Sequence, residues 1–169
     1  MTIGLLSDTH GFFDETLAIH FRDCDEIWHA GDIGSREVID ALEKIKPVVA
    51  VFGNIDDLEL CGRYPEDQWL TRDGVNIWIT HIAGRPPGYN PRVKRMLKDR
   101  KPAVLICGHS HICEVKKDES NQLLFINPGA AGQQGFHAMR TAMRLEIASG
   151  KISKLEVIEL GKRGMIRKG

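Results

Sequence analysis

The first 34 residues, MTIGLLSDTHGFFDETLAIHFRDCDEIWHAGDIG, hold the pattern on which the fold depends. Two short apolar runs, Ile3–Leu6 and Glu26–Ala30, each end abruptly in polar residues. Runs of this kind are typical of strands that are buried on both faces. Between them, Glu15–Phe21 has the apolar spacing of a helix, and Asp14 is placed to cap it. The stretch therefore predicts a strand, a helix and a second strand.

The same alternation continues along the chain. A helix is predicted from Ser35 to a point before Pro47, and another from Asn90-Pro91 to about residue 100. Further buried strands are predicted at Val48–Phe52, Val75–Thr80 and Ala103–Cys107. The other segments are typical of hairpins: Gln68–Arg72 with Val75–Thr80, Ile112–Lys116 with Leu123–Asn127, and Thr141–Ala148 with Lys151–Leu160. Strand–helix units followed by hairpins predict an α/β domain with mixed sheets, in which two packed sheets have helices outside.

The composition excludes several classes of protein. The 169 residues include 23 basic and 23 acidic side chains, so the formal net charge is zero. This balance excludes a generally basic nucleic-acid binder and a polybasic membrane-surface protein. The 42% of apolar residues excludes disorder. We expect one domain over residues 1–160 and a basic, poorly ordered tail over residues 161–169.

The cysteines and the N-terminus indicate the compartment. The four cysteines show no CxxC spacing, and the first residues lack a basic segment followed by a long apolar run. The longest uncharged run, residues 120–139, is rich in Asn, Gln, Gly and Pro, so it does not predict a membrane span. We therefore expect a reduced, cytoplasmic protein with no membrane partner.

Side chains that can bind metals stand where the predicted strands end. The carboxyl ends of strands in an open α/β sheet form a ligand-binding edge, so five strands would bring these side chains to one rim. They are two carboxylates, one amide and four of the seven histidines: Asp8, His10, Asp32, Asn54, His81, His109 and His111. This donor set is too large for one ion and suits two divalent ions that share a ligand. Nitrogen and oxygen donors without thiolate favour Mn²⁺, Fe²⁺, Zn²⁺, Ni²⁺ or Co²⁺ over Mg²⁺ or Ca²⁺.

Taken singly, these motifs also have structural explanations. Asp8-Thr9-His10-Gly11 and Gly53-Asn54 are compatible with turns, and Gly31-Asp32 alone is a very weak signal. His81 alone is compatible with a hydrogen-bonded core histidine. The two histidines of Gly108-His109-Ser110-His111 are more specific, because they can present both imidazoles at one site. Found together at successive strand ends, the motifs predict a two-metal site.

This ordered set of motifs closely resembles the calcineurin-like metallophosphoesterases. The matching segments are Asp8-Thr9-His10, Gly31-Asp32, Gly53-Asn54-Ile55-Asp56, Thr80-His81 and Gly108-His109-Ser110-His111. The similarity covers the chain from Ile3 to about Gly132, and the small size is similar to the YfcE-type branch of phosphodiesterases. The resemblance implies a four-layer α/β sandwich, in which two facing mixed sheets are flanked by helices.

The resemblance also implies a role for each residue. The first-metal ligands would be Asp8, His10, Asp32 and His111. The second-metal ligands would be Asp32, Asn54, His81 and His109, with Asp32 shared. The implied reaction is hydrolysis of a phosphodiester, in preference to a phosphomonoester, by a hydroxide that bridges the two ions, while Asn54 stabilises charge on the phosphoryl oxygens. We expect Mn²⁺ as the cofactor, with Ni²⁺, Zn²⁺, Fe²⁺ or Co²⁺ as alternatives.

Three positions depart from the family pattern. Many members carry a histidine where this chain has Ile55, and isoleucine cannot protonate a leaving group. We therefore expect better turnover of activated aryl esters than of alkyl esters. Residues 82–84, Ile-Ala-Gly, replace a common Gly-His, and Ala130 stands where a serine is frequent.

Substrate contacts are less well marked than the metal ligands. Residues 85–101 hold seven basic side chains and one acidic one, which is typical either of a solvated helix face or of an electropositive lip. Arg85 is the candidate substrate-binding residue of this stretch. The substrate would be a small phosphorylated molecule, with a nucleotide or a nucleic-acid end as alternatives.

Several aromatic and basic residues near these motifs have more than one interpretation. Phe12 and Phe13 fit a hydrophobic staple better than a pocket wall. His20 and His29 are expected to be structural. The roles of His137 and Arg140 stay open, because both could reach the rim or take part in packing.

The leading hypothesis is thus a hydrolase, and its rival is a binding module. A eukaryotic retromer subunit of this fold acts as a protein-interaction scaffold with an impaired metal site. Here all seven ligand positions carry competent side chains, which favours the enzyme. Ile55 keeps the scaffold hypothesis open. A homodimer is compatible with the predicted hairpin edges.

Overall fold

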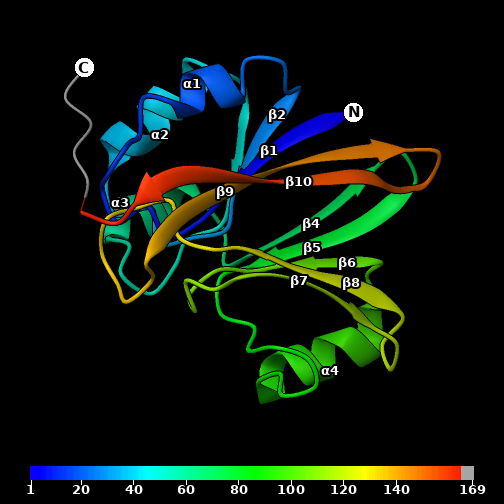
Figure 1. Ribbon diagram of the computed structural model, residues 1–169. Helices are drawn as coiled ribbons and strands as arrows, with labels where there is room; N and C mark the ends of the chain where they lie inside the picture. The colour runs from blue at the N-terminus through cyan, green and yellow to red at the C-terminus, as the bar shows by residue number, and fades with distance from the viewer. Residues whose placement is uncertain (165–169) are drawn as a thin grey trace.

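The computed structural model describes residues 1–164, which form two five-stranded mixed sheets and four helices (Figure 1). The first sheet has the strand order β10-β9-β1-β2-β3. Its strands are β1 (Thr2–Leu6), β2 (Glu26–His29), β3 (Val48–Ala50), β9 (Met139–Ala148) and β10 (Lys151–Lys162). Strands β1, β2 and β3 are parallel, and β9 joins β1 in the antiparallel sense.

The second sheet has the order β4-β5-β6-β8-β7. Its strands are β4 (Asp67–Arg72), β5 (Val75–Thr80), β6 (Val104–Ile106), β7 (Cys113–Asp118) and β8 (Leu123–Pro128). Here β5, β6 and β8 are parallel, and β4 and β7 form the antiparallel edges. The helices are α1 (Leu17–His20), α2 (Arg36–Glu43), α3 (Leu58–Arg63) and α4 (Pro91–Arg100).

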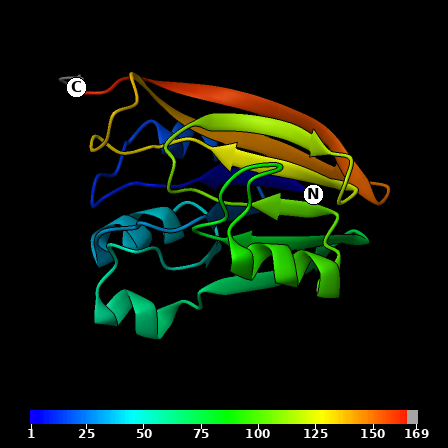
Figure 2. The ribbon, with the colours of Figure 1, turned by 90° about the horizontal axis from the view of Figure 1, so that it is seen from below.

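Three hydrophobic cores separate four layers. The middle core lies between the two sheets and contains Ile3 and Trp28 from one sheet and Ile77 and Ile106 from the other. A second core packs α1, α2 and α3 against the first sheet, and a third packs α4 against the second sheet. Figures 1 and 2 show α4 on the opposite side of the molecule from α1 and α2. The structure confirms the four-layer sandwich that the family resemblance implies.

Local sequence explains most of the elements. The Asn90 side chain accepts a hydrogen bond from Val93 N at 2.9 Å and caps α4, and Pro91 follows at the first helical position, as predicted. The hairpin turns Asp73-Gly74 and Ser149-Gly150 have positive φ at both residues, which a tight two-residue hairpin turn requires.

Four features differ from the prediction. Helix α1 begins only at Leu17, because Asp14 accepts hydrogen bonds from the backbone and hydroxyl of Thr16 and holds a turn there. Helix α3 has no counterpart in the prediction. Ser35 occupies the N-cap of α2 but makes no side-chain capping bond.

The C-terminal segment is the fourth difference. Strand β10 continues through Gly161 and Lys162, which pair with Arg140 and Met139 of β9, so these two residues belong to the sheet and not to the expected tail. Residues 165–169 of that tail lie outside the described part of the chain. Within residues 1–164 no helix is both long and apolar enough to cross a membrane.

Candidate metal centre

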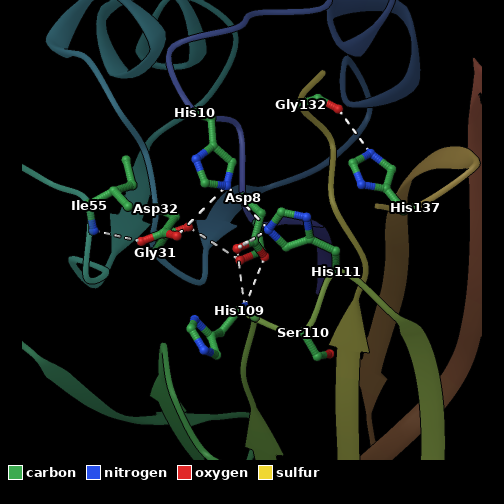
Figure 3. A network of polar contacts seen from close by, with 12 residues as sticks. Asp8, His10, Gly31, Asp32, Ile55, His109, Ser110, His111, Gly132 and His137 are labelled. Atoms are coloured by element: carbon green, nitrogen blue, oxygen red, sulfur yellow. Dashed lines mark hydrogen bonds and ion pairs between the residues drawn. The ribbon is translucent and has the colours of Figure 1, made fainter. Parts of the chain in front are cut away.

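The predicted ligands meet where the carboxyl ends of both sheets face each other. Asp8 and His10 follow β1, Asp32 follows β2, and Asn54 follows β3. From the second sheet, His81 follows β5, and His109 and His111 follow β6. Figure 3 shows Asp8, His10, Asp32, His109 and His111 converging from these loops. The structure thus brings together all seven side chains that the sequence singles out.

The backbone of these loops is held in a costly conformation. Five of the seven residues have a positive φ, between 48° and 68°: Asp8, His10, Asp32, His109 and His111. Non-glycine residues adopt this left-handed region at a cost of roughly 1 kcal/mol or more each, and such residues gather at functional sites. Hydrogen bonds from Asp8 N to Gly31 O and from His10 N to Asp32 O, both 3.0 Å, hold the first two loops side by side. The surrounding fold therefore imposes the direction of the ligand side chains.

The first cluster consists of Asp8, His10 and His111. The Nε2 atoms of His10 and His111 are 3.2 Å apart, and His111 Nε2 is 3.3 Å from Asp8 Oδ1. Asp8 is fully buried, and both of its carboxylate oxygens accept a hydrogen bond from the backbone N–H of His109 at 3.1 Å. Asp8 therefore contributes an oxygen to one cluster and positions the residue that begins the other.

The second cluster consists of Asp32, His81 and His109, together with the amide of Asn54. Asp32 Oδ1 is 3.1 Å from His81 Nε2. Asn54 Oδ1 lies 3.2 Å from His81 Nε2 and 2.9 Å from His109 Nδ1. Four side chains from four loops thus turn their donor atoms to one point.

Asp32 stands between the two clusters. Its Oδ1 faces His81, and its Oδ2 is 3.7 Å from His10 Nε2. The carboxylate is 2% exposed, and Ile55 N donates a hydrogen bond to Oδ1 at 3.1 Å. A carboxylate with one oxygen toward each cluster has the arrangement that a shared ligand needs.

The donor atoms fit divalent ions. Bonds of about 2.0–2.2 Å from an ion to nitrogen and oxygen ligands place neighbouring ligand atoms about 3–3.5 Å apart. Five of the separations between ligand atoms within the clusters are between 2.9 and 3.3 Å, and the His and Asp ligand atoms of each cluster all lie within 4.8 Å of one another. Both clusters contain imidazole and carboxylate and neither contains sulfur, which suits Mn²⁺, Fe²⁺, Ni²⁺, Co²⁺ or Zn²⁺.

The protonation of the second cluster follows from its contacts. His81 Nδ1 donates a hydrogen bond to Ala30 O at 2.8 Å, which leaves Nε2 directed at Asp32. Burial lowers the pKa of His81, but the contact with Asp32 outweighs it and raises this pKa. Burial raises the pKa of Asp32, and the hydrogen bond with His81 reverses that effect and lowers it. The contact between the two side chains thus stabilises the charged form of each, the imidazolium of His81 and the carboxylate of Asp32.

A buried histidine supports the first two loops from below. His29 is fully buried, and this burial lowers its pKa to about 3, so the ring is neutral. Its Nδ1 accepts a hydrogen bond from Gly31 N at 3.2 Å, and its Nε2 donates to Thr9 Oγ1 at 2.9 Å. The Thr9 hydroxyl in turn donates to Ile33 O at 2.9 Å. The structural role expected for His29 is thus visible as a chain of hydrogen bonds between the two loops.

Asp56 supports the centre in a way that the sequence did not reveal. Its two oxygens accept hydrogen bonds from Gly34 N at 2.7 Å and from Gly53 N at 2.8 Å, so Asp56 ties the Asp32 loop to the Asn54 loop. Gly53 itself has to be glycine, because a Cβ atom there would overlap Asp32 Oδ1 and the Asp32 backbone. In the sequence, Asp56 was marked only by its place in the Gly53-Asn54-Ile55-Asp56 motif.

Two open cavities adjoin the centre. One, of about 480 Å³, contains five of the predicted ligands and is also lined by Ile55, Ile112, Phe136 and His137. The other, of about 420 Å³, is lined by Asn54 and His81 and by Phe52, Glu66, Ile82 and Arg92. Asn54 lines both cavities.

Other sequence candidates lie elsewhere. Arg85 lines neither cavity and pairs with Glu114 at 3.1 Å, so the structure does not bring this predicted substrate-binding residue to the centre. Arg140, left open by the sequence, is buried and pairs with Asp14 at 2.6 Å. His137, also left open, lines the larger cavity.

The phenylalanines near the first motif also lie away from both cavities. Phe13 packs against the core beneath α1 and α2. The guanidinium carbon of Arg140 lies over the ring of Phe12, 5.2 Å from the centroid of that ring. Neither phenylalanine lines the cavities described above. These positions argue against the pocket wall, and the hydrophobic staple stays a prediction.

Comparison with known proteins gives a consistent result. Residues 1–150 match the family described as "Calcineurin-like phosphoesterase superfamily domain". A probable metallophosphoesterase of Methanocaldococcus jannaschii is 31% identical over 165 residues, which cover 94% of this chain and 82% of that protein. These matches confirm the family resemblance seen in the motifs.

Solved structures of similar fold include an enzyme and a sorting protein. A novel archaeal phosphodiesterase superposes with a TM-score of 0.69 and 25% identity, over 94% of this chain and 100% of that chain. A single mutant of Vps29 from Entamoeba histolytica superposes with a TM-score of 0.73 and 18% identity, over 94% of this chain and 99% of that chain. At 18% identity, the second likeness concerns the fold alone.

Proposed function

Because the chain belongs to the calcineurin-like phosphoesterase superfamily, we propose that it is a phosphodiesterase that works with two divalent metal ions. The observation that carries the proposal is the pair of clusters joined by Asp32, whose carboxylate oxygens face one cluster each. Mn²⁺ is the proposed metal, and Ni²⁺, Zn²⁺, Fe²⁺ and Co²⁺ suit the same donors.

The seven side chains would divide between two ions. Asp8, His10 and His111 would hold one ion and His81, His109 and Asn54 the other, while Asp32 would be common to both. When bound, the ions would lower the pKa of a water and withdraw charge from the phosphoryl oxygens. Two carboxylates against two divalent ions leave the centre positive, so it attracts a phosphate ester.

The chain's own groups would orient the phosphate. Asn54 points its carbonyl oxygen at His81 and His109, so its amide nitrogen is free to donate to a phosphoryl oxygen. The fixed loops hold these donors in place before substrate arrives, which avoids reorganisation during the reaction.

The two cavities support a preference for diesters. A phosphoryl group beside Asn54 would have open space on both sides, of about 480 and 420 Å³. A diester has two organic groups to place, whereas a monoester has one. The substrate class would therefore be a small phosphodiester.

The leaving group would have to depart without a proton from residue 55. Ile55 N donates to Asp32, and its apolar side chain cannot act as an acid. Esters of acidic alcohols, such as phenols, leave as stable anions, so the proposal includes faster hydrolysis of aryl than of alkyl esters.

One assay plate tests the proposal. Chelator-stripped protein is supplied with Mn²⁺, Ni²⁺, Co²⁺, Zn²⁺ or Mg²⁺ and offered bis-p-nitrophenyl phosphate or p-nitrophenyl phosphate. His109→Ala removes an exposed ligand without emptying the core, and His20→Ala, outside both clusters, is the matched control. We expect metal-dependent hydrolysis of the diester above the monoester, a loss of roughly 100-fold or more in His109→Ala, and no change in His20→Ala. Folded protein that hydrolyses neither ester with any metal would favour the scaffold hypothesis instead.

A further inference from the structure

Three exposed apolar side chains surround the mouth of the larger cavity. Phe136 is fully exposed, Ile112 is 52% exposed and Ile55 is 45% exposed. They come from the loops after β8, β6 and β3, so no single segment accounts for them. All three line the cavity that contains His10, Asp32, Asn54, His109 and His111. We call Ile55, Ile112 and Phe136 the apolar rim.

An apolar rim around a polar base is an informative arrangement. Single exposed apolar residues are common on protein surfaces and need no explanation. Apolar side chains that gather around one concave site mark a place where an apolar group binds. The base of this cavity is built from carboxylate, amide and imidazole, so the ligand would be charged at one end and apolar at the other.

The backbone that carries Phe136 is fixed on both sides. Gly135 lies so close to the ring of His111 that a Cβ atom would overlap Nδ1, and its φ is +116°. After Phe136, His137 Nε2 donates a hydrogen bond to Gly132 O at 3.1 Å, as Figure 3 shows. The guanidinium of Arg163 donates to His137 O at 3.0 Å. The backbone of Phe136 is therefore held at a defined position beside the ligands, and its phenyl ring is presented to solvent.

Aromatic rings bind flat partners through their faces. Ring pairs contribute beyond the area they bury, and a fully exposed ring has both faces available. Ile55 and Ile112 add branched side chains that pack against the edges of a flat group, and they carry no hydrogen-bonding atoms. The rim thus suits a planar aromatic substituent better than a sugar or a short polar alcohol.

We infer that the apolar rim binds a planar aromatic group of the substrate and so makes this site selective for aryl-bearing phosphoesters. The inference rests on the proposed function and specifies its substrate class. It agrees with the chemistry of Ile55, because an aromatic alcohol leaves without the proton that isoleucine cannot supply. Phe136 is the specificity-determining residue in this arrangement.

The test compares the binding of two unreactive ligands. Phenylphosphonate and methylphosphonate share the charged group, resist hydrolysis and differ in the aromatic ring. Calorimetric titration of the Mn²⁺-loaded protein is expected to give roughly fivefold tighter binding of phenylphosphonate. In Phe136→Ala the two affinities should differ by no more than about twofold, while methylphosphonate binding stays unchanged. Phe136→Trp should restore the difference.

A matched variant and a second ligand pair sharpen the result. Leu58→Ala removes an apolar side chain that is 91% exposed and lines neither cavity, so it should leave both affinities unchanged. AMP and ribose 5-phosphate, titrated in the same way, differ by a nucleobase. If Phe136→Ala reduces the preference for AMP over ribose 5-phosphate more than the preference for phenylphosphonate over methylphosphonate, the bound aromatic group is a base. The opposite result identifies a simple aryl group.

The outcomes separate the inference from the proposed function. Equal binding of both phosphonates to the unmodified protein, or an unchanged preference in Phe136→Ala, would overturn the inference and leave the rim to a macromolecular partner, with the phosphoesterase proposal intact. Failure of both phosphonates to bind in the presence of Mn²⁺ would also overturn the inference, whereas the proposed function falls only if the hydrolysis assay described above shows no activity.

Discussion

Replacing Asp32 with asparagine removes the charge that both clusters share while keeping the shape of the side chain. Asp32 is buried, and its surroundings leave no room for a larger group, since even a Cβ atom on Gly53 would overlap it. Asparagine has the same volume, so we expect Asp32→Asn to fold normally. The effect on metal binding is then electrostatic.

The magnitude follows from the distances in the centre. Asp32 oxygens lie 3.1 Å from His81 Nε2 and 3.7 Å from His10 Nε2, so ions held by those nitrogens would be in direct contact with the carboxylate. Two unit charges about 4 Å apart interact by ~4 kcal/mol at an effective dielectric constant of about 20. That energy corresponds to roughly a thousandfold change in affinity. Because the amide oxygen remains a neutral ligand, we expect at least a ~100-fold loss for one of the two ions.

The assay is a titration of chelator-stripped protein with Mn²⁺, followed by calorimetry. The unmodified chain should bind two ions, and Asp32→Asn should bind at most one at the same concentration. Asp40→Asn removes a half-exposed carboxylate on α2 that belongs to neither cluster, and this variant should bind two ions. The stabilisation against unfolding that Mn²⁺ provides should fall in parallel in Asp32→Asn. Two ions bound by Asp32→Asn with unmodified affinity would refute the shared-ligand reasoning.

Three further outcomes are expected. Arg140→Met leaves the carboxylate of Asp14 buried without its cationic partner, so it should lower the free energy of unfolding, measured by urea denaturation, by about 3 kcal/mol or more. Arg22→Met, which removes an exposed ion pair, should change this free energy by under about 1 kcal/mol. Burial raises the pKa of Asp14, but hydrogen bonds from Thr16 and Arg140 lower this pKa below its usual value. The free energy of unfolding of the unmodified protein should therefore exceed that of Asp14→Asn at neutral pH, and this difference should vanish as the pH falls below about 4. A difference that does not depend on pH would contradict this sign. Gly53→Ala forces Asp32 to move, so this variant should no longer bind two Mn²⁺ ions at once. Gly62→Ala, whose Cβ atom would meet nothing within 4 Å, should still bind both ions.

The order of the ligands could be predicted from sequence because it depends on local features. A short apolar run that ends in Asp, Asn or His marks the carboxyl end of a buried strand, and parallel strands share that end. The capping of α4 by Asn90 and the hairpin turn at Asp73-Gly74 are equally local, because each requires only a few neighbouring residues. The residues of the centre were therefore within reach of the sequence, and their order carried the family resemblance that implied the sandwich.

Contacts between distant segments had to come from the tertiary structure. Arg85 and Glu114 are 29 residues apart, and the sequence did not reveal their pairing, which holds Arg85 outside both cavities. Helix α1 was predicted too long, because the sequence pattern did not reveal the turn that Asp14 makes with Thr16.

The division between the two levels is clearest around the centre itself. The sequence alone determined which side chains are available to bind metal, since the strand ends that carry them are encoded by adjacent residues. Only the tertiary structure decided that Asp32 presents one oxygen to each cluster, and that Ile55, Ile112 and Phe136 surround one cavity. Those relations join loops from both sheets. They arise from the packing of one sheet on the other, which brings together residues that no local pattern connects.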